Sequence, residues 1–411
     1  MNVRKGRNLL GVALTLFVTA AGWGQSTSAA IASGHYLYVW TGDTEGKSND
    51  FLAVIDADPS SSSYGRLLTT VPTEQQTKQV HHTEYSMPAS GMLFANDHYA
   101  GTTFIFDVRD SLHPKLATSF ADMDGYMHPH SYVRLPNGHV LATFQHMHHS
   151  GMQGMENTGG LVEIDDSGKV IRSSSAADSA FPGALLTPYG LAAIPEKDRV
   201  VSTNSSMHLE ELLHGVTLQI WRLSDLKLLK TMYVDVGENR YAHITPQEPR
   251  LGPDGAVYVQ SLSCGLQRVT GFDSDTPKVK MVYTFPGQWC GVPTIVGHYL
   301  VQSVRSLHGI VVLDIAQGEK PVEVSRLVLG ESYLAHWTGW DPKTQRIVVT
   351  SGNQPKDRLF LVKLDPKTGA VALDESFRDS DGKPGFSFVD KEWPHGWKGS
   401  GAPHGAVFSR D

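Results

Sequence analysis

The sequence of 411 residues has few cysteines, no excess of basic residues and no long apolar run beyond its first thirty residues. Its two cysteines, Cys264 and Cys290, cannot make a disulfide framework, although they could pair in an oxidising compartment. Lys and Arg total 35 against 42 Asp and Glu, without a basic cluster, which argues against nucleic acid as a partner. Convincing amphipathic helices are also absent from residue 35 onward, which excludes a helical bundle.

The first thirty residues have the composition of a targeting segment. Three basic residues precede an apolar run over 9–21, and small residues end at Ala30. A membrane-spanning helix needs about 20 apolar residues, so we interpret residues 1–30 as a secretory signal peptide cleaved near Ala30. The alternative is an N-terminal membrane anchor. We expect a periplasmic or secreted protein without stable membrane insertion after cleavage.

The remaining sequence consists of short apolar or alternating runs separated by Gly, Pro, Asn and Asp, which is typical of an all-β fold. One unit recurs: a strand, a turn, an apolar second strand, a loop, a third strand ending in Asp, and a trailing strand. Six copies occupy residues 81–110, 130–166, 189–225, 248–273, 292–318 and 336–369. Repetition of this kind indicates a propeller or another repeat architecture.

The two ends of the sequence complete a seventh unit. Residues 403–408 resemble a first strand with nothing after it, and residues 35–59 resemble second and third strands with nothing before them. A ring closed by strands from both termini leaves no open sheet edge. We therefore predict that residues 31–411 form a single domain, an all-β, seven-bladed β-propeller.

The sequence contains 19 histidines, and several of them occupy the same position in different repeat units. The turn between first and second strands carries a proline in five of them: Pro88, Pro136, Pro195, Pro253 and Pro342. The residues six positions before these prolines are His82, His130, Tyr189, Gln247 and His336. His404 has the matching place in the terminal strand. In the unit whose turn has no proline, Trp289 or Cys290 lies nearest to this position. Because the first strand of each blade lines the channel, these histidines should converge at one rim.

Such a ring of imidazoles predicts a transition-metal site. Neutral imidazole binds Cu, Zn, Fe and Ni, whereas Ca²⁺ and Mg²⁺ prefer oxygen ligands. For any one of these histidines, the alternative is a side chain that hydrogen-bonds a loop carbonyl. Glu84 and Tyr85 are the candidate catalytic residues, since either could assist proton or electron transfer. Glu84 and Glu248 could instead be polar strand ends, and Tyr85 could cap the channel.

A second group of histidines falls in the loops between second and third strands, which should open on the same rim. It comprises His98, His146, His148, His149, His208, His214 and His308. His81 and His128 flank the register and are candidates for ligands or for side chains that orient ligands. The loop 145–152 (QHMHHSGM) combines Met and His, which suits copper, and a solvated loop is the alternative.

The sequence resembles the selenium-binding protein family, whose bacterial members include copper-dependent methanethiol oxidases, over essentially all of the mature chain. Residues 54–72 and 80–84 (VHHTE) resemble the family's Asp-Pro-x-Ser-x-x-Tyr segment and His-His pair. Residues 102–116 resemble its strand ending in Pro-Lys-Leu, and residues 306–330 resemble its Leu-His-Gly strand. PHGAVF, 403–408, falls on its Ala-His-Glu strand.

The resemblance implies a copper site and the oxidation of a small thiol such as methanethiol with O₂. The ligands that it implies are His81, His82, His130, His308 and His404, whereas His336 rests on the internal register alone. The cysteine pair that follows the His-His element in many members is absent, so selenium binding through a thiol is unsupported. Val133 stands where the family has the second histidine of His-Thr-x-His.

Three alternatives remain open from the sequence. The metal could be another transition metal, and the protein could be a non-catalytic propeller that binds metal or a protein partner. A lactonase-like hydrolase would need Glu and Asn ligands for Ca²⁺, against which the histidines weigh. For the enzyme, the expected partner is a small-molecule substrate.

Overall fold

The computed structural model describes residues 1, 34–43, 45–77, 79–121, 123–147, 158–208, 211–237 and 244–410. The expected signal peptide, apart from Met1, and the loop residues His148 and His149 lie outside this set. Residues Gly34–Asp411 form one compact unit. Across the described ranges, no helix is long and apolar enough to cross a membrane.

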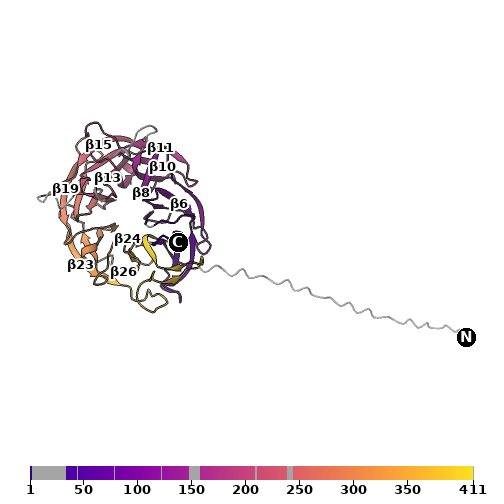
Figure 1. Cartoon of the computed structure of the whole chain (residues 1–411). Helices are drawn as coiled ribbons and strands as arrows, with labels where there is room; N and C mark the ends of the chain where they lie inside the picture. The colour runs from indigo at the N-terminus through magenta and orange to yellow at the C-terminus, as the bar shows by residue number, and fades with distance from the viewer. Residues whose placement is uncertain are drawn as a thin grey trace. The chain divides into compact units, whose positions relative to one another are not determined.

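Seven four-stranded antiparallel sheets are arranged in a ring, with β8 and β24 on its inner side and β11, β15, β19 and β23 on the outside (Figure 1). From the channel outward, the first blade consists of β30 (Gly401–Phe408), β1 (Tyr36–Asp43), β2 (Phe51–Asp56) and β3 (Leu67–Pro72). The second consists of β4 (Val80–Thr83), β5 (Met92–Asp97), β6 (Thr102–Asp107) and β7 (Lys115–Phe120). The third consists of β8 (Tyr126–Arg134), β9 (Val140–Met147), β10 (Gly160–Ile164) and β11 (Val170–Ser175).

The other four blades follow the same order. The fourth consists of β12 (Pro188–Ile194), β13 (Arg199–Asn204), β14 (Thr217–Arg222) and β15 (Lys227–Tyr233). The fifth consists of β16 (Pro246–Leu251), β17 (Val257–Ser261), β18 (Gly265–Thr270) and β19 (Lys278–Thr284). The sixth consists of β20 (Thr294–Val296), β21 (Tyr299–Val304), β22 (Gly309–Asp314) and β23 (Val322–Val328). The seventh consists of β24 (Trp337–Asp341), β25 (Arg346–Thr350), β26 (Phe360–Leu364) and β27 (Val371–Leu373).

Outside the blades, the described residues contain one short hairpin and three short 3₁₀ helices. The hairpin is β28 (Lys391–Glu392) with β29 (Lys398–Gly399), and the helices are η1 (Pro195–Lys197), η2 (Leu212–His214) and η3 (Arg305–Leu307). The predicted seven-bladed propeller is therefore confirmed. Its first blade is also the predicted composite of both chain ends, because β30 pairs antiparallel with β1, placing Phe408 opposite Leu37.

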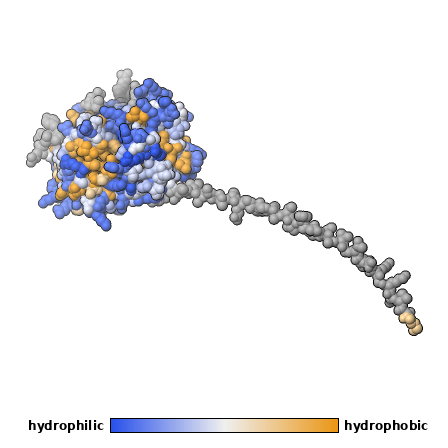
Figure 2. Space-filling model, turned by 90° about the horizontal axis from the view of Figure 1, so that it is seen from below, coloured by the Kyte–Doolittle hydropathy of each residue, from blue (hydrophilic) through white to orange (hydrophobic). Residues whose placement is uncertain are grey.

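The burial of each strand follows from its place in the blade. β2 (FLAVID) is buried along its whole length because both of its faces pack against neighbouring blades. β23 (VEVSRLV) alternates between exposed and partly buried residues because one face of an outer strand meets solvent. The surface is accordingly a mixture of polar areas and smaller apolar patches, as the face in Figure 2 shows.

A hydrogen bond from one blade to the next recurs around the channel. A side chain near the end of the second strand donates to a backbone carbonyl at the start of the next blade's inner strand. The donors are Asn96, Thr143, Thr203, Gln260, Ser303 and Thr350, and the acceptors are His130, Tyr189, Gln247, Gly291, His336 and His404, respectively. These acceptors are the register positions of the sequence, and Gly291 takes that place in the sixth blade instead of Trp289 or Cys290.

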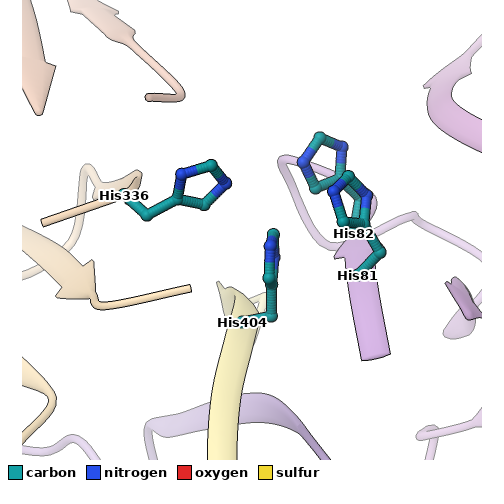
Figure 3. Close-up of side chains that lie close together, drawn as sticks. All are labelled: His81, His82, His336 and His404. Carbon is teal, nitrogen blue, oxygen red and sulfur yellow. The ribbon is translucent and has the colours of Figure 1, made fainter. Parts of the chain in front are cut away.

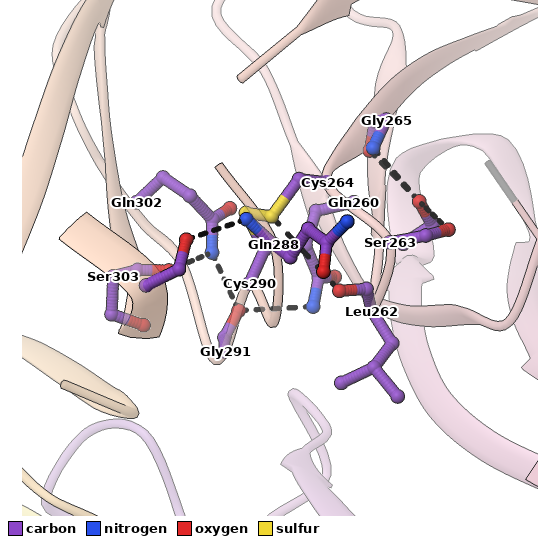
Figure 4. The surroundings of a disulfide bond; sticks show 12 residues. Gln260, Leu262, Ser263, Cys264, Gly265, Gln288, Cys290, Gly291, Gln302 and Ser303 are labelled. Atoms are coloured by element: carbon purple, nitrogen blue, oxygen red, sulfur yellow. Dashed lines mark hydrogen bonds between the residues drawn. A yellow bond between two sulfur atoms is a disulfide. The ribbon is translucent and has the colours of Figure 1, made fainter. Parts of the chain in front are cut away.

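The two cysteines form a disulfide (Figure 4). Cys264 lies in the turn after β17 and Cys290 lies shortly before β20, so the bond joins the fifth and sixth blades. Next to it, the Gly291 carbonyl accepts hydrogen bonds from the amides of Gln260 and Gln302. The disulfide therefore anchors the segment before β20, the inner strand whose following turn is short and contains no proline.

Reduction of this disulfide should lower the free energy of unfolding by about 3 kcal/mol, because the bond closes a loop in the unfolded chain. The cysteines are 26 residues apart. Urea unfolding with and without dithiothreitol measures the difference. A Cys264→Ala/Cys290→Ala variant should match the reduced protein and should not respond to the reductant. An unchanged midpoint on reduction would contradict the prediction.

Candidate metal centre

Five imidazoles meet at the start of the inner strands. His81 and His82 belong to β4, His130 to β8 and His404 to β30, and His336 directly precedes β24. The ring centres are 4.0 Å apart for His81 and His82, 4.4 Å for His81 and His404, 4.5 Å for His81 and His130, and 4.7 Å for His336 and His404. Four of the five rings surround a common space in Figure 3.

A β-bulge explains how two consecutive residues of β4 both reach this site. Val80 pairs with Asp97 and Thr83 with Ala95, so His81 and His82 together oppose the single residue Asn96. The Asn96 amide oxygen accepts the backbone N–H of His82 at 3.0 Å. In a regular strand, neighbouring side chains would point to opposite faces.

The same bulge recurs in the inner strands of five blades. The residue pairs that it contains are 81–82, 130–131, 189–190, 247–248 and 404–405. By this alignment His81, rather than His82, is equivalent to His130 and His404. The proline spacing pointed to His82 because the turn that follows β4 is one residue longer than its counterparts. His82 instead shares the second bulge position with Ser131 and Glu248.

Each of the five histidines has one buried ring nitrogen that lacks a hydrogen-bond partner. The atoms are Nδ1 of His81, Nε2 of His82, Nε2 of His130, Nε2 of His336 and Nδ1 of His404. Buried polar atoms in folded proteins are nearly always paired. Five such nitrogens facing one region fit a bound species that accepts lone pairs, as a transition metal does.

The imidazoles are neutral at pH 7, which keeps those lone pairs available. Burial, followed by the neighbouring imidazoles, holds the pKa of His81 and His82 well below its usual range. The same causes lower the pKa of His130 and His404. Burial and, to a smaller extent, the Arg305 guanidinium lower the pKa of His336 to about 4.

Two overlapping ligand sets can be drawn from these residues. One atom each from His81, His82, His336 and His404 lie within 4.8 Å of one another, and so do atoms of His82, His130 and Glu248. His82 belongs to both sets. The Nδ1–H of His130 donates to the Tyr189 carbonyl at 3.0 Å, which leaves its Nε2 as the ligand atom.

Glu248 is the carboxylate that lies beside the histidines. One of its oxygens is 3.6 Å from the Nδ1 atoms of both His82 and His130. Ser131 donates to it at 2.8 Å, and the Tyr85 hydroxyl donates to its other oxygen. Burial raises the pKa of Glu248, and the Arg250 guanidinium acts in the opposite direction.

Tyr85 lies against this carboxylate in a closely packed setting. Its ring stacks on Trp337 with centres 5.1 Å apart, and the guanidinium of Arg250 stands 3.8 Å from its centre. Burial, followed by the charge of Glu248, raises the pKa of Tyr85, so the phenol stays protonated and donates to Glu248. Tyr85 is thus joined to the histidines through Glu248.

Two predicted site residues have other surroundings. Glu84 accepts hydrogen bonds from the Nε and Nη2 atoms of Arg134 at 3.0 and 2.9 Å, and from the backbone N–H of Phe94 at 3.1 Å. His308 follows η3 with a positive φ of 56°, and its Nδ1–H donates to the Tyr333 carbonyl at 3.0 Å. Among the residues that the structure describes, neither side chain contacts the five imidazoles.

Known proteins resemble this chain over part of its sequence and in its fold. A methanethiol oxidase from Hyphomicrobium sp is 31% identical over 148 residues, 34% of this chain and 34% of that protein. The matched segment is thus about a third of the relative's length. A hypothetical selenium-binding protein from Sulfolobus tokodaii superimposes with a TM-score of 0.68 at 15% identity, over 91% of this chain and 93% of that one. The chain is thus similar over a third of its length to a methanethiol oxidase and shares the propeller fold of a selenium-binding protein.

More distant propellers share only the fold. The periplasmic gluconolactonase of Pseudomonas aeruginosa superimposes with a TM-score of 0.56 at 13% identity, over 92% of this chain and 99% of that one. No family model matches the sequence. The resemblance noted from short motifs is confirmed by these comparisons, and the His/Glu groups at the channel could hold a metal.

The metal-free protein should lose stability as the pH falls from about 6.5 to about 4. An unfolded imidazole titrates near pH 6.5, whereas the folded pKa of His336 is about 4, so the unfolded chain binds more protons in this window. Each such histidine should contribute a loss of about 1 kcal/mol per pH unit. Urea unfolding at pH 7 and pH 5 measures the slope.

The matched variant for this measurement is His336→Gln. It should show a pH dependence that is shallower by about 1 kcal/mol per pH unit. Equal slopes for the two proteins would contradict the assignment of a neutral, desolvated imidazole to this position.

Proposed function

We propose that this protein is an exported metalloenzyme that oxidises a small thiol, such as methanethiol, with O₂ at a copper ion held in the channel. The observation that carries the proposal is the set of five buried imidazole nitrogens without hydrogen-bond partners. The relationship to a methanethiol oxidase supports the choice of substrate. The ligands would come from His81, His82, His130, His336 and His404.

Copper suits these ligands and this reaction better than other metals. An all-imidazole set binds copper most strongly among the divalent first-row metals, and zinc has no redox chemistry. When bound, copper would supply the one-electron chemistry that O₂ requires. His308, which the family resemblance implies as a ligand, lies outside both ligand sets, so we assign it no role at the metal.

Glu248 and Tyr85 are suited to hold and move a proton beside the ligands. The carboxylate stands between His82, His130 and the Tyr85 hydroxyl. Tyr85 also lines a cleft of about 450 Å³, together with Met87, Trp340 and other residues. Between a small thiol in this cleft and the histidines would lie the Tyr85 phenol and the Glu248 carboxylate. Glu84 is bound to Arg134 and serves the fold instead.

The export of the protein remains part of this proposal. Structural disulfides persist in oxidising compartments, and Cys264 and Cys290 form one here. A periplasmic or secreted location therefore agrees with the signal-like composition of residues 1–30. The alternative function is a propeller that binds metal without turnover, which metal content without oxygen uptake would favour.

Replacing His82 and His130 by alanine should remove bound copper and abolish oxygen uptake with methanethiol, because His82 belongs to both ligand sets. The measurements are metal analysis of the purified protein and oxygen consumption. His113→Ala/His298→Ala removes two imidazoles elsewhere and should leave both quantities unchanged. Unchanged copper content in the first variant would overturn the proposal.

Tyr85→Phe should retain the metal and lower kcat roughly 10- to 100-fold, because it removes the hydroxyl that donates to Glu248. The pH profile of kcat should change as well, which a purely structural role would not cause. Tyr299→Phe, which removes a hydroxyl bonded to the Lys367 carbonyl in another blade, is the control. A normal kcat and pH profile for Tyr85→Phe would exclude the proton-transfer role.

A further inference from the structure

Four more histidines gather beside the metal centre, toward the loops between second and third strands. His98 follows β5, His128 is in β8, His146 is in β9 and His208 follows β13. The ring centres are 5.5 Å apart for His98 and His128, 5.3 Å for His128 and His146, 5.5 Å for His146 and His208, and 6.5 Å for His128 and His208. We call this group the rim cluster.

These spacings fit imidazoles that share one ion. With a metal–nitrogen distance of about 2 Å, two imidazoles on a tetrahedral ion have ring centres about 5 Å apart. Three of the four separations given above are close to this value. Three different blades supply the rings, so the arrangement arises from the tertiary fold and not from one loop.

Backbone contacts orient the rings as ligands. The Nδ1–H of His128 donates to the His98 carbonyl at 3.0 Å, and the Nδ1–H of His98 donates to the Pro129 carbonyl at 3.2 Å. Such backbone contacts through Nδ1 are the usual way in which proteins orient metal-binding histidines. The Nε2 of His208 is buried without a hydrogen-bond partner.

His128 also adopts a backbone conformation that few side chains accept. Its φ is +59°, in the left-handed region, where non-glycine residues are uncommon and where strain is often associated with function. This conformation precedes the β8 bulge that presents His130 to the metal centre. One short segment therefore serves both groups of histidines.

The rim cluster is continuous with the metal centre. The ring of His98 is 5.8 Å from that of His130 and 6.0 Å from that of His81. His128 and His208 are partly exposed, whereas His98 is buried. The imidazoles thus form an unbroken series from partly exposed positions to the buried centre.

We propose that His98, His128, His146 and His208 form a second metal site, which binds Cu(I) more weakly than the channel centre and passes it inward through His98. The inference rests on the proposed function, because it assumes that the channel centre holds copper. Successive ring separations of 5.3 to 5.5 Å, partial exposure and continuity with the buried ligands together favour a site for capture and transfer.

Titration of metal-free protein with Cu(I) against a chromophoric chelator tests the second site. The unaltered protein should bind two equivalents with different affinities. His128→Asn/His208→Ala should lose the weaker equivalent and keep the tighter one, and copper should load the channel centre at least tenfold more slowly from a limiting supply. Asparagine is chosen because it tolerates a positive φ.

The control His113→Ala/His298→Ala removes two imidazoles outside both groups and should keep both equivalents and the loading rate. His82→Ala/His130→Ala should lose the tighter equivalent and keep the weaker one, so the two sites can fail separately. A single equivalent in the unaltered protein, or two in His128→Asn/His208→Ala, would overturn the second site. An unchanged rate of copper loading in His128→Asn/His208→Ala would overturn the transfer role. Thermal unfolding of the metal-free variants verifies that each one is folded.

Discussion

The bulge at the start of the inner strands is the constraint on which the metal centre depends. In four of the five blades with this bulge, one side chain on the second strand makes two hydrogen bonds: Asn96 accepts the bulged N–H of His82 and donates to the His130 carbonyl in the next blade. Thr143 does the same for Ser131 and Tyr189. These bonds satisfy backbone groups that the bulge leaves unpaired. They also set the distance between one blade's channel residues and the next, and so the spacing of the imidazoles.

Ring closure completes the centre. His404 lies near the end of the chain and His81 lies near its beginning, yet their rings are 4.4 Å apart because β30 enters the first blade as its inner strand. The resulting cluster is unfavourable without a ligand, since buried nitrogens lack partners and charging any one imidazole would be opposed by its neighbours. A bound metal would relieve both penalties, so metal binding would stabilise the folded protein.

Much of the architecture could be predicted because a propeller repeats its pattern. The units, the split first blade and the convergence of His130, His336 and His404 follow from counting residues between turns. Counting failed at two places where the turn length differs. It put His82 in the place that His81 occupies, and it offered Trp289 or Cys290 where Gly291 lies. A bulge adds a residue without leaving a sign in an apolar or histidine-rich strand.

The sequence by itself determined the all-β repeat, the number of blades and which histidines lie near the channel, because strand periodicity and turn residues are local. Only the tertiary structure decided which acid lies beside the histidines. Glu84 and Glu248 look alike in sequence, but Arg134 of the next blade pairs with the first, whereas the second faces His82 and His130. The same holds for His308, whose turn directs its ring to the Tyr333 carbonyl. Such contacts join residues far apart in the chain, and no local pattern encodes them.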